Sequence, residues 1–128
     1  MREVRFHIHR KSAFAGALLP YRMYINGQYI GTIRNGKSLD ANVPKAGVYY
    51  IEDDILFSRN AVIYDNGLSE YSVVIKRAGG WRTESYNEFY MEKGNVLEQL
   101  PSFHWEKLFE LQQSMSQSER LLALSVEF

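Results

Sequence analysis

The sequence predicts a mainly β fold: an antiparallel β-sandwich or barrel-like domain with one helix and a final strand towards its C-terminus. Three observations support this fold class. Apolar residues alternate with polar ones along several segments, glycine-containing turns separate these segments, and helical spacing occurs only after Gly94. The 128 residues are 45% hydrophobic and 23% charged, which is typical of a globular domain. We therefore expect residues 1–128 to form a single domain.

The first half of the chain predicts strands joined by tight turns. In residues 4–9 the apolar side chains occupy the even positions and basic ones the odd positions, which is typical of a strand with one buried face. Residues 21–25 and 28–34 flank Asn26-Gly27, a dipeptide that favours the positive φ angles of a hairpin turn. Two further turns are expected at residues 35–36 and 44–47, and a strand is expected at residues 48–51.

The second half predicts two more turns and then a change of structure. A fourth hairpin is expected where residues 61–64 meet residues 71–76 across Asp65-Asn66-Gly67, and Gly79-Gly80 turns the chain into residues 81–86. After Gly94, apolar residues at mixed three and four spacing predict a helix over about 102–116, with Ser102 as its cap. Alternation over 122–128 predicts a final strand.

The charge is unevenly distributed, although the formal net charge is zero. Residues 1–50 contain eight Lys or Arg and two acids, whereas residues 51–128 contain seven basic and 13 acidic residues. If each part forms its own face, neighbouring copies attract each other; if the parts interleave as neighbouring strands, little external field remains. The nine tyrosines favour the first interpretation and a homodimer, since aromatic rings are enriched in interface cores.

The absence of cysteine excludes disulfides, thiolate zinc sites and cysteine nucleophiles, and it fits a reducing compartment. Residues 13–19 match a signal peptide poorly, and no apolar run is long enough for a transmembrane helix. We expect a cytoplasmic protein with no cofactor and no membrane partner. An extracytoplasmic location is the alternative if a signal segment was removed.

Three patterns could indicate catalysis or ligand binding, and each has a simpler interpretation. Residues 31–38 match the phosphate-loop pattern, but a helix must begin at its lysine, and the following residues do not continue a helix. His7 and His9 project from one strand face, yet two ligands do not make a zinc site, which favours a solvated face. Asp53 and Asp54 are adjacent and point to opposite sides, so they do not form an acid and base pair. We therefore expect no enzymatic activity, no metal site and no catalytic residues.

The candidate interaction surface combines aromatic and basic residues. Tyr49 and Tyr50 face opposite ways on one strand, so we expect at least one ring to reach solvent or a partner. Trp81 adds a second aromatic position, and the basic strand face adds three more residues: Arg5, His7 and His9.

Short motifs between residues 4 and 52 resemble PEGA-type surface domains and related bacterial accessory domains. The motifs are Tyr24-Ile25-Asn26-Gly27, Ile30-Gly31-Thr32-Ile33, Asn35-Gly36, and Pro44 followed by Gly47-Val48-Tyr49-Tyr50-Ile51. The families pair a Tyr-Ile-Asp-Gly hairpin with a Val-Gly strand and a Pro-Gly turn. The resemblance implies a small antiparallel β-sandwich and no catalytic residues.

These observations lead to a ranked set of functions. The first is a non-enzymatic domain that binds or assembles with a protein, including a second copy of itself. The second is a module for a small ligand or carbohydrate, in which exposed tyrosines or Trp81 serve as stacking platforms. The third is a nucleic-acid reader that uses the basic first part, which the acidic second part disfavours.

Overall fold

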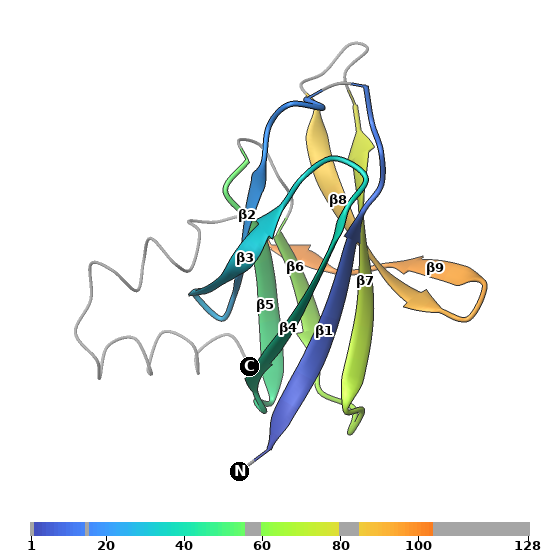
Figure 1. Ribbon diagram of the computed structural model, residues 1–128. Coiled ribbons are helices and arrows are strands. Elements are labelled where there is room, and N and C mark those ends of the chain that lie inside the picture. The colour runs from blue at the N-terminus through green and yellow to red at the C-terminus, as the bar shows by residue number, and fades with distance from the viewer. Residues whose placement is uncertain (1, 15, 56–59, 80–84, 104–128) are drawn as a thin grey trace.

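The structure is a computed structural model, and it describes residues 2–14, 16–55, 60–79 and 85–103. These residues form ten strands in two five-stranded sheets (Figure 1). In spatial order, the first sheet consists of β4 (Ser38–Pro44), β1 (Glu3–Arg10), β7 (Glu70–Ala78), β8 (Tyr86–Lys93) and β9 (Val96–Gln99). The second consists of β10 (Ser102–Phe103), β6 (Asn60–Tyr64), β5 (Val48–Asp53), β2 (Tyr21–Ile25) and β3 (Gln28–Ile33).

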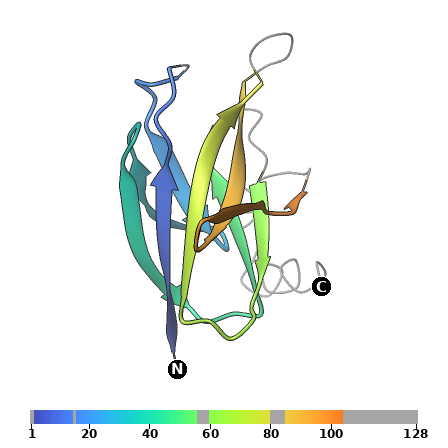
Figure 2. The ribbon, with the colours of Figure 1, turned by 90° about the vertical axis from the view of Figure 1, so that its right-hand side faces the viewer.

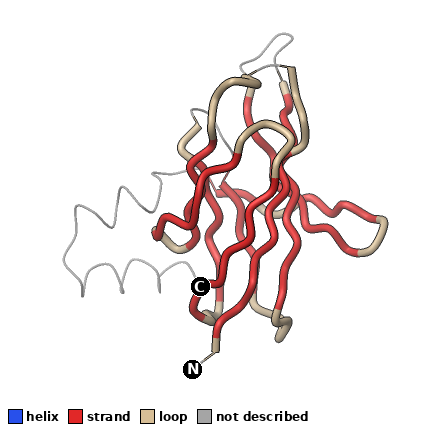
Figure 3. The backbone as a smooth tube through the Cα atoms, in the orientation of Figure 1, coloured by secondary structure: helices blue, strands red, loops and turns tan. Residues whose placement is uncertain are grey.

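The fold class predicted from the sequence is confirmed in its main feature. The described residues contain only strands and loops (Figure 3), and the two sheets form separate layers that do not close into a barrel (Figures 1 and 2). Strand pairing is antiparallel except between β1 and β7, which run parallel. Most of the predicted helix and the whole predicted final strand lie outside the described residues. Residues 102–103, predicted to begin that helix, instead form β10, because their backbone pairs with Ala61 and Asn60 of β6.

Two of the predicted strand pairings are hairpins. β2 and β3 pair across Asn26 and Gly27, whose φ angles of 51° and 81° are those of the expected tight turn. The Asn26 side chain fastens this turn to β5, since its Nδ2 donates to Val48 O and its Oδ1 accepts from Tyr50 N. β7 pairs with β8 as well, but β8 starts at Tyr86, the last residue of the segment expected after Gly79-Gly80, and residues 80–84 lie outside the described residues. The sequence did not predict β9, which pairs with β8 and projects with it from the two layers (Figures 1 and 2).

The other predicted turns connect the two sheets and do not form hairpins. The predicted pairing of residues 61–64 with residues 71–76 is wrong, because β6 belongs to the second sheet and β7 to the first. The turns at residues 35–36 and 44–47 also cross between the sheets. Two strands joined by such a turn lie in different sheets and direct their apolar side chains into the same core. The chain must therefore reverse between them, but the two strands do not hydrogen-bond to each other.

The core lies between the sheets and follows the alternation of the strands. Val4, Phe6 and Ile8 are buried, as predicted, and the Phe6 ring stacks on Tyr71 with 5.3 Å between ring centroids. The ring of Tyr49 meets Phe6 edge-on at 5.1 Å. These contacts join β1 and β7 of one sheet to β5 of the other, so the sheets share a single apolar core.

The strand order separates the oppositely charged parts of the chain. Residues 1–50 supply β4 and β1 at one side of the first sheet, and β2 and β3 at the same side of the second. Residues from 51 onwards supply almost all of the opposite side. The described residues up to 50 include eight basic and two acidic residues, and those after 50 include three basic and eight acidic ones. The described part of the fold is therefore basic on one side and acidic on the other.

Candidate functional site

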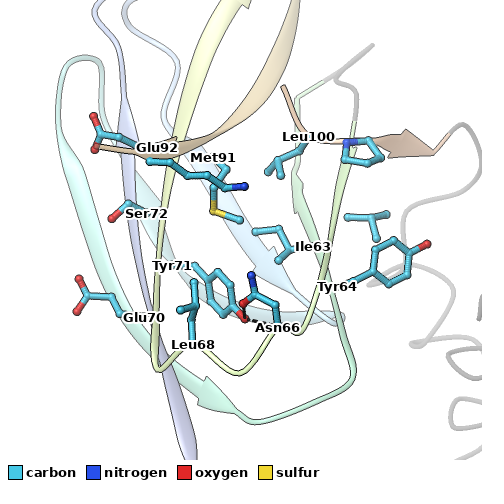
Figure 4. Close-up of a pocket in the computed structure, with 13 residues that line it drawn as sticks. Ile63, Tyr64, Asn66, Leu68, Glu70, Tyr71, Ser72, Met91, Glu92 and Leu100 are labelled. Atoms are coloured by element: carbon cyan, nitrogen blue, oxygen red, sulfur yellow. Dashed lines mark hydrogen bonds between the residues drawn. The ribbon is translucent and has the colours of Figure 1, made fainter. Parts of the chain in front are cut away.

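An apolar groove opens between the sheets on the acidic side of the fold (Figure 4). It has a volume of about 360 Å³ and is bordered by β6, the connection from β6 to β7, the start of β7, the end of β8 and the residues after β9. We call it the β6–β8 groove. Its apolar lining includes Ile63, Leu68, Tyr71, Met91 and Leu100. A volume above about 300 Å³ with mainly apolar walls is typical of ligand-binding clefts.

The walls of the groove are a continuation of the core. Ile63, Tyr71 and Met91 are buried, because each takes an inward position in the alternation of its strand. Figure 4 shows these side chains and Leu100 converging on the space, whereas Leu68 lies at the mouth and is half exposed. The floor of the groove is therefore fixed by the packing of both sheets.

The turn that borders the groove is held by the Tyr71 hydroxyl. Tyr71 Oη lies 3.1 Å from Asp65 Oδ1 and 3.0 Å from Asn66 Oδ1, and it accepts a hydrogen bond from Asn66 N. Burial, and to a smaller extent the Asp65 carboxylate, raise the pKa of Tyr71, so the hydroxyl stays protonated and can donate. The opening is thus preformed, which lowers the entropic cost of binding.

The rim of the groove is polar and mostly acidic. The carboxylates of Glu70 and Glu92 point to the outer face of the first sheet at the border of the groove (Figure 4), and they form no salt bridge within the described part of the chain. Glu92 also borders a hollow with His7, His9 and Lys11. Lys93 also borders the groove, but its ammonium group pairs with Glu98 at 3.4 Å. A positively charged group of a bound ligand can therefore meet these carboxylates only at the outer edge of the groove, beside the apolar space.

The basic residues predicted as an interaction surface lie together on the outer face of the first sheet. His7 Nδ1 lies 2.6 Å from Asp40 Oδ1, His9 Nδ1 lies 2.8 Å from Ser38 Oγ, and Arg5 pairs with Asp40 at 3.2 Å. The hydrogen bond from His7 is the largest cause of a lowered pKa at Asp40. No group of three metal-ligating side chains occurs in the described ranges. The prediction that one strand face carries these side chains is confirmed.

The aromatic residues do not join this surface. The exposed fractions of Tyr49 and Tyr50 are 0% and 2%, so the expectation that one ring would reach solvent is wrong. β5 lies between β2 and β6, and all six of its residues are buried, on both faces of the strand. Trp81 lies outside the described residues. The predicted residues therefore do not form one site.

Two of the other patterns have the local structure that the sequence predicted. Residues 31–38 run from β3 through a turn into β4, so a strand follows Lys37 where a phosphate loop requires a helix. Asp53 is buried, whereas Asp54 is exposed and accepts a hydrogen bond from Arg22 N, so the two side chains do point to opposite sides.

A buried polar cluster at the end of the fold opposite the β6–β7 turn was not predicted. Asn87 links both sheets: its amide nitrogen donates to Asp53 Oδ2 at 2.8 Å, and its oxygen accepts from the Tyr21 hydroxyl and Arg77. The Arg10 guanidinium lies 3.5 Å from the centre of the Tyr21 ring. Arg10 occupies an even position in the alternating run that starts at Val4, and the even positions of this strand point inward. The alternation could therefore have predicted that the Arg10 side chain is buried.

Searches against protein-family models, curated proteins and solved structures found no match to this chain. The resemblance to PEGA-type domains therefore stays a prediction. Within the described ranges, no helix has the length and apolar character needed to cross a bilayer.

Proposed function

We propose that the chain is a non-enzymatic binding or assembly domain whose β6–β8 groove holds an apolar segment of a protein partner. The observation that carries this proposal is the groove itself, with about 360 Å³ of space, buried apolar walls and an acidic rim. A cavity of about 150 Å³ is enough to hold a benzene ring. The groove can therefore accept an aromatic side chain and a second aliphatic one.

The expected affinity is modest. Two buried apolar side chains contribute about 3 to 6 kcal/mol, part of which is offset by the entropic cost of association. We therefore expect a dissociation constant on the order of 1 mM for a short segment. Lys or Arg beside the apolar residues should strengthen binding through Glu70 and Glu92, and salt should weaken that contribution.

The carbohydrate alternative has less support. The most exposed tyrosines in the described ranges are Tyr29 and Tyr64. Tyr29 lies on β3, at one edge of the second sheet, and Tyr64 lies on β6, on the far side of β5 and β2. Two rings placed so far apart do not form one stacking platform.

A peptide-binding experiment tests the proposal. Two fluorescent peptides would share a Phe- and Leu-containing centre and differ only in Lys or Glu flanks, and their binding would be followed by fluorescence anisotropy. Leu68→Lys places a charge at the groove mouth, and Val96→Lys is the matched control on an exposed β9 residue that does not line the groove. We expect the wild type and the Val96 variant to prefer the Lys-flanked peptide and the Leu68 variant to lose binding. Equal binding by all three proteins would contradict the proposal.

A further inference from the structure

The loop between β1 and β2 presents large apolar side chains to solvent. Phe14 is fully exposed, at 103%, Leu18 is 94% exposed, and Leu19 is half exposed. We call residues 13–14 and 16–19 the apolar tip. Surface hydrophobic residues scattered singly are common, but a group of them on one loop indicates a binding surface.

The backbone of the apolar tip is fastened to the rest of the fold. The Arg10 side chain, only 2% exposed, donates to Leu19 O at 2.6 Å and to Gly16 O at 3.0 Å. At the start of the tip, Ala13 N donates to Asn35 Oδ1 at 2.9 Å. These hydrogen bonds hold the backbone at Ala13, Gly16 and Leu19, which reduces the entropy lost on docking.

Basic side chains surround the apolar tip. Lys11 precedes it, and Arg34 and Lys37 lie in the turn between β3 and β4, which contacts the same loop through Asn35. Residues 11–20 and 34–37 contain no carboxylate side chain. The apolar tip therefore has the chemistry that the β6–β8 groove favours: apolar side chains next to positive charge.

The tip and the groove lie at different ends of the fold. β1 and β7 run parallel, with Arg5 beside Glu70 and Arg10 beside Ile75. The tip follows the end of β1, whereas the groove lies beside the start of β7, so about 17 Å of strand separates the two levels. Figure 1 shows the β1–β2 loop at one end and the β6–β7 connection at the other. A chain therefore cannot place its own tip in its own groove.

We infer that the apolar tip of one copy docks in the β6–β8 groove of a second copy. Phe14 enters the apolar space, and the cations around the tip approach the acidic side of the second copy, where Glu70 and Glu92 border the groove. This inference rests on the proposed function and names a second copy of this chain as the occupant. With one tip-to-groove contact between neighbouring copies, the contact is heterologous and leaves a free tip and a free groove at the ends of each assembly. Growth into short chains follows, whereas two reciprocal contacts between the same two copies would stop at a dimer.

Sedimentation equilibrium over about a hundredfold concentration range tests this arrangement. Phe14→Asp disables the tip, Leu68→Lys disables the groove, and Val96→Lys is the surface control. We expect the wild type and the control to form dimers and larger species, and each of the other two variants to lose self-association at least tenfold. An equimolar mixture of the Phe14 and Leu68 variants retains one intact tip and one intact groove, so it should form a dimer that does not extend.

The mixture distinguishes the inference from its alternatives. A wild type that stays monomeric overturns it, and so does a mixture that remains monomeric while the wild type associates, because that result indicates a self-complementary interface. Phe14-dependent binding to anionic lipid vesicles by a monomeric wild type would assign the tip to a membrane surface. If self-association fails but the Lys-flanked peptide still binds the groove, the inference fails and the proposed function stands. If neither binds, both fail.

Discussion

Replacing Arg10 should destabilise the fold and release the apolar tip. The guanidinium donates to three backbone oxygens: Leu19 O at 2.6 Å, Ile33 O at 3.0 Å and Gly16 O at 3.0 Å. Arg10→Met keeps much of the apolar side chain and removes all three donors. The change therefore isolates the polar contribution of one buried side chain.

The magnitude follows from what the three carbonyls lose. The bond to Ile33 O is buried, and an unsatisfied buried acceptor costs about 1 to 3 kcal/mol. The carbonyls of Leu19 and Gly16 are partly buried and can turn to water, so each loses roughly 0.5 to 1.5 kcal/mol. Contact with the Tyr21 ring adds about 1 kcal/mol, and relief from burying the cation offsets part of the sum. We expect a net loss of about 3 kcal/mol in the free energy of unfolding.

Urea unfolding followed by circular dichroism measures this loss. Arg10→Lys keeps the charge but cannot span three acceptors, so it should fall between the wild type and the Met variant. Arg22→Met is the matched control, because two thirds of the Arg22 side chain is exposed. An Arg10→Met protein within about 0.5 kcal/mol of the wild type would refute the role of Arg10 as the anchor of the tip.

Three further predictions concern single contacts. Asn26→Ala should lower the free energy of unfolding by about 2 to 3 kcal/mol, because it removes two hydrogen bonds to β5 and places alanine at a φ of 51°. Asn26→Gly also lacks the hydrogen bonds but has no strain at this φ, so in thermal unfolding it should be more stable than the Ala variant and less stable than the wild type. Gly31→Ala should cost about 1 to 3 kcal/mol, since φ is +146° and the new Cβ would lie 2.6 Å from Leu39 Cδ1, whereas Gly47→Ala, with open space around it, should leave the melting temperature unchanged. The pKa of Asp40 is lowered below its ordinary value of 3.8, so the Asp40 carboxylate stabilises the fold above that pH. The difference in unfolding free energy between wild type and Asp40→Asn should therefore vanish as the pH falls through the lowered pKa of the folded protein. A difference that persists in acid would contradict the His7 and Arg5 contacts.

The elements that could be predicted from the sequence depend on local patterns. Alternation from Val4 to Ile8 predicted β1 and its buried face, and Asn26-Gly27 predicted the β2–β3 hairpin. Turn residues show that the chain reverses, but not which sheet the next strand joins. For that reason the turn at residues 65–67 was predicted as a hairpin, although β7 pairs with β1 and β8.

The groove depends on contacts between residues that are distant in sequence, and these were not predictable. Ile63, Tyr71 and Met91 come together only because β6 and β7 cross between sheets and β8 pairs with β7. Tyr50 was expected at the surface because adjacent strand residues face opposite ways, but both faces of β5 are buried. Phe14 and Leu18 were considered only as part of a segment that matches a signal peptide poorly. Their exposure was not predictable, because it depends on the hydrogen bonds by which Arg10 holds the loop.

Methyl NMR of the methionines tests most directly whether the β6–β8 groove is a binding site. Met91 lines the groove, whereas Met23 is fully buried in the core away from it and serves as an internal reference in the same spectrum. On concentrating the full chain, and on adding the Lys-flanked peptide, we expect the Met91 methyl resonance to move and that of Met23 to stay in place. A Met91 resonance that stays fixed while the chain associates or binds the peptide would contradict the account, because binding would then occur elsewhere.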